Sequence, residues 1–219
     1  MICWSCERAT EPAPGEATCS FCGALLPVDQ AADYFSVFGL PRRYDLDVAA
    51  LEARYRELTR KLHPDRFAKA DPRERRASLG RSVQLNEAWR TLKEPVKRAE
   101  YLLGLLGVEV APETGGKVPA ELLGEILELR EALGEARMEG DDVTVQRMAV
   151  EMRERVAKSL AAVAQGLSES SPAESTRATA EGLDAVARQL VALRYYRRFL
   201  DEVEVHDEAV FARGESGHG

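Results

Sequence analysis

Apolar residues recur three and four positions apart along most of the chain, which is the spacing of one face of an α-helix. The clearest segment follows Asp47, a favourable N-cap residue, and ends near His63, where Pro64 disfavours helical backbone. We therefore predict a helix over residues 48–62. Its apolar face consists of Val48, Leu51, Tyr55, Leu58 and Leu62.

The same spacing continues on both sides of this segment. A short apolar stretch, residues 34–40, precedes it and ends in Gly39 and Pro41. A longer helix is predicted from about Pro72, interrupted at Pro95, and a further short helix then runs to Gly107. The apolar stripe of the longer helix contains Leu85, Trp89 and Leu92.

Three long helical patterns fill the C-terminal part of the chain. Short polar turns at residues 140–142 and 168–175 separate them, so the helices should alternate in direction as a three-helix bundle over residues 118–207. Residues 108–117 are predicted to be a linker, and residues 208–219 a disordered tail. The three apolar stripes are Leu122, Ile126, Leu129, Leu133 and Ala136; Val145, Met148, Met152, Val156, Leu160 and Val163; and Leu183, Val186, Leu190, Leu193, Leu200 and Val203.

Composition agrees with a helical protein. Of the 219 residues, 45% are hydrophobic and only 6% aromatic, while Ala, Leu, Glu and Arg dominate and favour helices over sheets. No run approaches the ~18 uncharged apolar residues of a membrane-spanning helix, and no secretory core is present near Met1. The expected fold class is all-α, with no membrane span and no export.

The formal net charge of -7 hides two segments of opposite sign. Residues 33–107 contain 16 basic and 11 acidic residues, whereas residues 118–207 contain 11 basic and 18 acidic residues. Overall acidity argues against general nucleic-acid binding. Opposite charges on two segments indicate two partners with opposite surface charge.

All four cysteines lie in the first 22 residues, in two Cys-x-x-Cys pairs twelve residues apart: Cys3 with Cys6, and Cys19 with Cys22. This spacing predicts a closed tetrahedral Zn²⁺ site in a small module over residues 1–30. Gly23 supports it, because glycine relieves the tight bend after the second pair. Disulfides fit a secreted chain and a redox pair needs a preceding strand, so both are disfavoured, while a rubredoxin-type iron site stays open.

The tripeptide His63-Pro64-Asp65 lies between the helix 48–62 and the next helix. Each residue has a local explanation, since His63 suits a helix C-terminus, Pro64 ends the helix and Asp65 favours a turn. Those explanations do not account for the trio between two antiparallel amphipathic helices, the first of which is basic. The arrangement resembles a J-domain, the helical hairpin that engages DnaK-class ATPase chaperones, over residues 33–107.

The J-domain resemblance implies that this loop and the basic helix bind the acidic surface of the chaperone and accelerate its ATP hydrolysis. His63, Pro64 and Asp65 would take the signature role, with Asp65 facing a chaperone arginine. Arg56 and Arg60, one turn apart and away from the apolar stripe, would steer association. The alternative is that these arginines form only a solvated helix face.

A wider resemblance, over residues 33–205, is carried by the motifs Asp33-Tyr34-Phe35, Phe38-Gly39-Leu40, His63-Pro64-Asp65-Arg66-Phe67, Leu85-Asn86-Glu87-Ala88-Trp89, Arg98-Ala99-Glu100-Tyr101-Leu102-Leu103 and Glu128-Leu129-Arg130-Glu131. Together these motifs resemble the HscB-type iron-sulfur cluster co-chaperones. The N-terminal tetracysteine extension resembles that of animal mitochondrial members, but no Arg-rich transit segment follows Met1, so a bacterial cytoplasmic location is expected.

The first bundle helix carries a second row of residues beside its core stripe. This row is half apolar and half acidic, with members four positions apart: Leu123, Leu127, Glu131 and Glu135, flanked by Glu128. The family resemblance places binding of an IscU-type scaffold here, together with Tyr195 of the last helix. Gly124 departs from the larger apolar residue often found there. The alternative is that the two leucines only widen the core face.

Together these features predict a J-domain hairpin, a three-helix bundle and a zinc-knuckle module acting as a non-enzymatic adaptor. The protein would bring an IscU-type scaffold to a DnaK/HscA-class chaperone and promote iron-sulfur cluster transfer. No phosphate loop or nucleophile–base pair is evident in the sequence. A general J-domain co-chaperone for unfolded clients, a zinc-ribbon nucleic-acid regulator and a redox enzyme are the alternatives.

Overall fold

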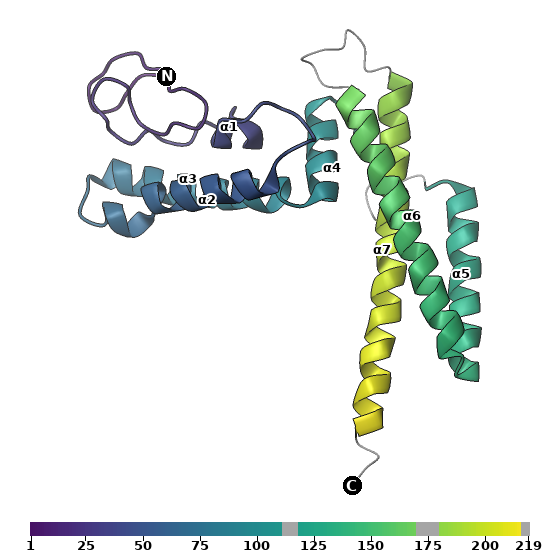
Figure 1. Ribbon diagram of the computed structural model, residues 1–219. Coiled ribbons are helices and arrows are strands. Elements are labelled where there is room, and N and C mark those ends of the chain that lie inside the picture. The colour runs from purple at the N-terminus through teal and green to yellow at the C-terminus, as the bar shows by residue number, and fades with distance from the viewer. Residues whose placement is uncertain (111–117, 170–179, 216–219) are drawn as a thin grey trace. The chain divides into compact units, whose positions relative to one another are not determined.

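The computed structural model describes residues 1–110, 118–169 and 180–215. Over these residues the chain forms seven α-helices and one short 3-10 helix, with only two isolated β-bridges and no β-strand, which confirms the all-α fold class (Figure 1). None of the described helices is long and apolar enough to cross a bilayer. The chain divides into two compact units, Met1–Leu102 and Leu103–Gly219, which are described separately.

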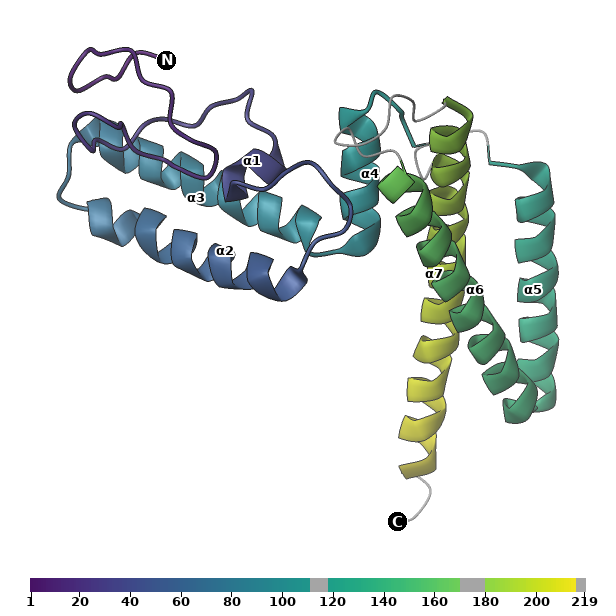
Figure 2. The same ribbon diagram turned by 45° about the horizontal axis from the view of Figure 1, so that its top comes forward.

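The first unit is built on an antiparallel helical hairpin. Its helices are α2 (Val48–Leu62) and α3 (Pro72–Leu92), joined through the 3-10 helix η1 (Pro64–Phe67), and they lie side by side in Figure 2. Asp47 begins α2, since its carboxylate accepts a hydrogen bond from the backbone N–H of Ala50 at 3.0 Å. The hairpin core is formed by Leu51, Leu58, Leu62, Ala77, Leu85, Ala88 and Leu92.

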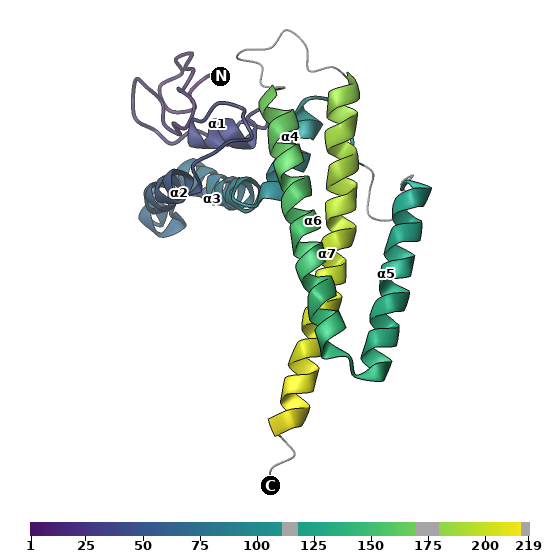
Figure 3. The same cartoon turned by 45° about the vertical axis from the view of Figure 1, so that its right-hand side comes forward.

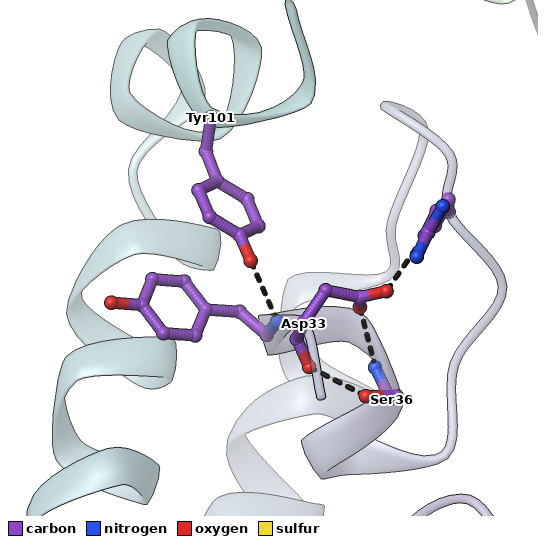
Figure 4. A network of polar contacts seen from close by, with 5 residues as sticks. Asp33, Ser36 and Tyr101 are labelled. Carbon is purple, nitrogen blue, oxygen red and sulfur yellow. Dashed lines mark hydrogen bonds and ion pairs between the residues drawn. The ribbon is translucent and has the colours of Figure 1, made fainter. Parts of the chain in front are cut away.

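A short helix, α1 (Tyr34–Phe38), packs against α3 and is fixed at its start by polar contacts (Figure 4). The Asp33 carboxylate accepts from the backbone N–H of Ser36 at 2.9 Å, which caps the helix. Tyr101 of α4 (Pro95–Leu105) accepts the backbone N–H of Tyr34 through its hydroxyl at 2.9 Å. This hydrogen bond and the stacking of the Tyr34 and Tyr101 rings, whose centroids are 4.4 Å apart, join the apolar stretch 34–40 to the short helix after Pro95.

The second unit contains three long helices, as the periodicity predicts. These are α5 (Ala120–Glu139), α6 (Asp142–Glu169) and α7 (Ala180–Glu215). Gly140 ends α5 with φ 70°, a left-handed conformation that glycine adopts without a steric cost. Helices α6 and α7 run side by side, as Figures 1 and 3 show, and α5 joins their core at its C-terminal half. That core consists of Leu133, Ala136, Val145, Met148, Ala149, Met152, Phe199 and Val203.

One predicted boundary differs from the structure, and two predicted segments lie mostly outside the described residues. Helix α7 continues to Glu215. A disordered tail was expected from residue 208 because the periodic apolar stripe ends at Val203, but the backbone remains helical beyond it. Residues 111–117 of the predicted linker (108–117) and residues 170–175 of the predicted turn (168–175) lie outside the described residues.

Candidate functional sites

The four cysteines converge on one point at the N-terminus of the first unit. Their sulfur atoms all lie within 4.8 Å of one another, with 3.6 Å between Cys3 and Cys22 and 3.8 Å between Cys6 and Cys19. These separations are far longer than a disulfide bond of ~2.05 Å. They agree with the ~3.8 Å edge of a tetrahedron whose metal–sulfur distance is ~2.3 Å, so the thiols fit a metal ion.

The two knuckles that carry these cysteines have the same backbone geometry. The N–H of Cys3 donates to Arg8 and that of Cys19 to Ala24, both at 2.9 Å, and a turn closes within each loop. Backbone N–H groups point at sulfur in both, from Ser5 to Cys3 at 3.4 Å and from Phe21 to Cys19 at 3.5 Å. Such donors stabilise thiolates, as a metal site requires.

The residue after each knuckle has a left-handed backbone. Gly23 has φ 73°, as its position suggests, and Glu7 has φ 58° although it is not glycine. Glu7 therefore replaces the expected glycine at the cost of local strain, without changing the turn.

The pKa values of two thiols reflect this environment. Burial disfavours the Cys19 thiolate, but hydrogen bonds from the backbone N–H groups of Phe21 and Cys22 outweigh burial and lower its pKa to about 6. The pKa of Cys6 moves the other way: the backbone hydrogen bond with Arg8 lowers it, but burial and hydrogen bonds with the other three thiols outweigh this and raise it to about 11. The cluster thus favours one thiolate and holds a proton on another thiol, and a metal ion bound by all four sulfurs would displace that proton.

The cysteine module is docked on α3. The Arg81 guanidinium donates to the carbonyls of Leu26 and Pro27 at 2.6 and 2.8 Å, and the Glu74 carboxylate accepts the N–H of Leu25 at 3.2 Å. Within the module, the indole N–H of Trp4 donates to the Leu25 carbonyl at 2.8 Å, and the Arg73 guanidinium of α3 lies over the Trp4 ring, 5.7 Å from its centroid. Sequence reasoning did not find this contact, because nothing in the pattern of α3 marks two charged residues as partners of a loop some fifty positions earlier.

The signature loop begins where α2 ends. His63 is the last residue before η1, and its Nδ1 accepts the backbone N–H of Asp65 at 3.3 Å, which leaves Nε2 to carry the proton of the neutral ring. The side chains of His63 and Asp65 are 51% and 90% exposed. The loop is thus ordered by backbone contacts while its two polar side chains face solvent.

Two serines of α3 hold the start of this loop. The Ser78 and Ser82 hydroxyls both donate to the Leu62 carbonyl, at 2.6 and 3.1 Å. This carbonyl is one of those left without a helical partner at the end of α2. The bonds fix the position of the loop against α3.

Arg56 and Arg60 lie on the exposed face of α2, as predicted from their spacing. Arg56 pairs with Glu52 one turn earlier, and its side chain is 69% exposed. On the neighbouring face, Glu57 accepts hydrogen bonds from Lys61 and Arg54, which lower its pKa to about 2. Exposed pairs of this kind contribute little stability, so the arginines remain available to a partner.

The predicted second row of α5 is open to solvent. Leu123 and Leu127 are 47% and 59% exposed, and Glu128, Glu131 and Glu135 are exposed too. The core of α5 is instead formed by Ile126, Leu133 and Ala136. The alternative in which both leucines widen the core is therefore wrong.

Polar contacts fix the N-terminal half of α5 to both other helices. Glu125 forms an ion pair with Arg155 of α6 and accepts the Tyr196 hydroxyl of α7 at 3.5 Å. Farther along, Arg130 pairs with Glu202 of α7. These residues were missed by the sequence analysis, because the apolar spacing does not show which glutamate of an acidic helix faces inward.

Tyr195 is half-buried on α7 and lies seven residues before Glu202. Residues seven apart share one helix face, so Tyr195 is on the face of α7 that meets α5. Its neighbour Tyr196 reaches Glu125, which places Tyr195 at the level of Leu123 and Leu127 along the bundle.

Comparison with known proteins divides the chain in the same way. Residues 33–101 match the DnaJ domain family, and residues 118–204 match the HSCB C-terminal oligomerisation domain family. A co-chaperone protein HscB homolog from Azoarcus sp. (strain BH72) is 39% identical over 142 residues, which are 65% of this chain and 80% of that protein. The iron-sulfur cluster co-chaperone protein HscB of Mus musculus is 40% identical over 138 residues, 63% of this chain and 59% of the mouse protein.

Two solved HscB structures are similar to this chain over most of its length. The crystal structure of human co-chaperone protein HscB has a TM-score of 0.80 and 26% identity, covering 94% of this chain and 98% of the human one. Chaperone HscB from Vibrio cholerae has a TM-score of 0.68 and 31% identity, covering 82% and 99%. The chain, with its DnaJ domain, HscB C-terminal domain and N-terminal cysteine cluster, therefore belongs to the HscB co-chaperone family.

Proposed function

We propose that this protein brings an IscU-type iron-sulfur cluster scaffold to a DnaK/HscA-class ATPase chaperone and stimulates the chaperone's ATP hydrolysis, which promotes cluster transfer. The observation that carries the proposal is the presence of two exposed surfaces of opposite character, one in each unit. The first is the basic hairpin with its signature loop, and the second is the acidic and apolar row of α5. The printed name of the mouse relative, an iron-sulfur cluster co-chaperone, supports it.

The hairpin would act on the chaperone through charge. The Asp65 carboxylate is 90% exposed, with only His63 Nδ1 near it at 3.5 Å, and it would meet an arginine of the chaperone. Because the Leu62 carbonyl is held by two serine hydroxyls, little conformational entropy is lost when the loop docks. Arg56 and Arg60 would raise the association rate with an acidic surface.

The row on α5 would hold the scaffold. Leu123 and Leu127 offer apolar area that remains in water in the free protein, and burial of that area favours binding. Glu128, Glu131 and Glu135 would select a basic surface around it, and Tyr195 would add an aromatic contact from α7. A row of this size suits one folded client better than a range of unfolded chains.

The cysteine site would hold one structural Zn²⁺. Four thiolates close the coordination shell, so the ion would contribute folding energy and not an open position for chemistry. In this proposal no residue of the chain makes or breaks a covalent bond, and all ATP hydrolysis takes place on the chaperone.

Steady-state ATP turnover of the chaperone tests the proposal. It should rise with this protein alone, rise further with this protein and IscU together, and remain low with IscU alone. The matched variants are Asp65→Ala, which should abolish both effects, and Leu127→Ala, which should reduce only the synergy. Equal synergy with a denatured polypeptide would instead indicate a general co-chaperone.

A further inference from the structure

An exposed apolar pair lies on the hairpin beside the signature loop. Leu79 and Val83 of α3 are 58% and 51% exposed, and their spacing of four residues places them next to each other on one helix face. The other large apolar side chains exposed in Met1–Leu102 are Met1, Ile2 and Phe21 of the cysteine module and Val48 at the start of α2. Within the described hairpin, the pair is thus the single apolar patch formed by adjacent turns.

The contacts of α3 place this pair close to the end of α2. Leu79 and Val83 each follow a serine, Ser78 or Ser82, whose hydroxyl reaches the Leu62 carbonyl just before His63. Successive helical residues differ by about 100° in direction, so the pair faces outward beside the point where α3 holds the loop.

The cysteine module covers the other side of α3 and stops short of the pair. A Cβ atom on Gly80 would lie 3.2 Å from a methyl group of Val28, and Arg81 is bonded to the module backbone. Gln84 donates to the Asp29 carbonyl at 3.5 Å. The pair is therefore open to solvent, although the module contacts Gly80 and Gln84, the residues directly after Leu79 and Val83.

The surface around the pair is mainly basic and adjoins α2, with one exposed carboxylate, Glu87, four residues after Val83. Arg75 and Arg76 precede Leu79 by one turn, and Arg90 follows Val83 by seven residues, and all three are exposed. Asn86, three residues after Val83, accepts the hydroxyl of Tyr55 from α2 at 2.8 Å, and Tyr55 is the neighbour of Arg56. The pair, the loop and the basic face of α2 thus form one surface.

We infer that Leu79 and Val83 are the apolar anchor of the chaperone-docking surface, and that the chaperone presents there an apolar patch edged by carboxylates. This inference rests on the proposed function and adds the contact that sets the lifetime of the complex. Charges at the edge of an interface mainly raise the association rate, whereas a buried apolar centre slows dissociation. A surface of arginines alone would associate quickly and also dissociate quickly.

The test is a double variant, Leu79→Gln with Val83→Gln, which keeps a helix-forming residue at both positions. In titrations of chaperone ATPase activity, the concentration for half-maximal stimulation should rise about ten-fold, equivalent to about 1.4 kcal/mol, with the saturating rate unchanged. The dissociation rate should rise by the same factor and the association rate should change little. The control is Val143→Gln with Val150→Gln, two exposed valines of α6 (81% and 52%) seven residues apart on one helix face, and this variant should behave as the unchanged protein.

Asp65→Ala separates this inference from the proposed function. If Asp65→Ala abolishes stimulation while the double variant titrates like the unchanged protein, the anchor is wrong and the proposed function stands. If Asp65→Ala stimulates normally, the proposed function itself fails. If the double variant instead converts a dimer to a monomer in light scattering and docks normally, the pair joins two copies of this chain and the inference is overturned.

Discussion

Replacing Leu127 by alanine should weaken scaffold binding and leave the bundle folded. Leu133→Ala on the same helix should instead destabilise the bundle, while the exposed row that would bind the scaffold keeps its side chains. Leu127 is 59% exposed and Leu133 only 2% exposed. Complete burial of a leucine is worth about 1.5–3 kcal/mol, so the covered two-fifths of Leu127 correspond to about 0.6–1.2 kcal/mol. Leu133→Ala also leaves a cavity among Met148, Met152 and Phe199, and should cost about 2–5 kcal/mol.

The same areas set the expected loss of affinity. If the scaffold covers the exposed three-fifths of Leu127, about 1–2 kcal/mol of burial is lost in the alanine variant. That loss corresponds to a roughly 5- to 30-fold higher Kd. Both variants keep helix propensity, because alanine is the strongest helix former.

Two measurements on the full chain check these values. Urea unfolding followed by circular dichroism gives the change in stability, and calorimetric titration with purified IscU gives Kd. The reasoning would be refuted if Leu127→Ala lost as much stability as Leu133→Ala, or if it bound the scaffold with unchanged Kd.

Four further predictions follow from the geometry. Asp65→Ala should remove chaperone stimulation with an unchanged melting temperature, since the side chain is 90% exposed, and a lowered melting temperature would contradict this. Elemental analysis should find one zinc per chain. Chelation should lower the melting temperature of the first unit, because the module is bonded to α3 through Arg81 and Glu74. An unchanged melting temperature would argue against metal-linked stability. Glu7→Gly should stabilise the module by up to about 1 kcal/mol, as glycine accepts φ 58° without strain, and urea unfolding of the zinc-loaded protein would show this. Lys61 and Arg54 lower the pKa of Glu57 to about 2, so the small stability that this exposed pairing adds is present above pH 4.5 and is lost as the pH falls toward 2. Glu57→Gln should reduce the change of the urea midpoint with pH across that window.

Local sequence determines much of the cysteine site and the helices. The twelve-residue separation of the two Cys-x-x-Cys pairs predicts a tetrahedral site, and the sulfur separations fit one. The expectation that α2 ends near His63 is confirmed, since Pro64 restricts the backbone before it. The identity of the metal and the roles of the site residues remain predictions.

Periodicity also predicted which side of α5 is buried, but only in part. Ile126, Leu133 and Ala136 were assigned to the core and are buried there. The spacing left Leu123 and Leu127 open between core and surface, because a helix can bury a stripe of variable width. Packing by α6 and α7 decided the width.

What the sequence by itself determines in this protein is therefore local: which residues are helical, where helices stop and which thiols are close enough to share an ion. These depend on backbone preference and on spacings of a few residues. Only the tertiary structure decides that Arg81 and Glu74 of α3 bind the cysteine module, that Glu125 faces Arg155 and Tyr196, and that Leu79 and Val83 stay uncovered. Each of these depends on which surfaces meet between distant segments, and a charged or apolar residue on a helix looks the same in the sequence whether a partner covers it or water does.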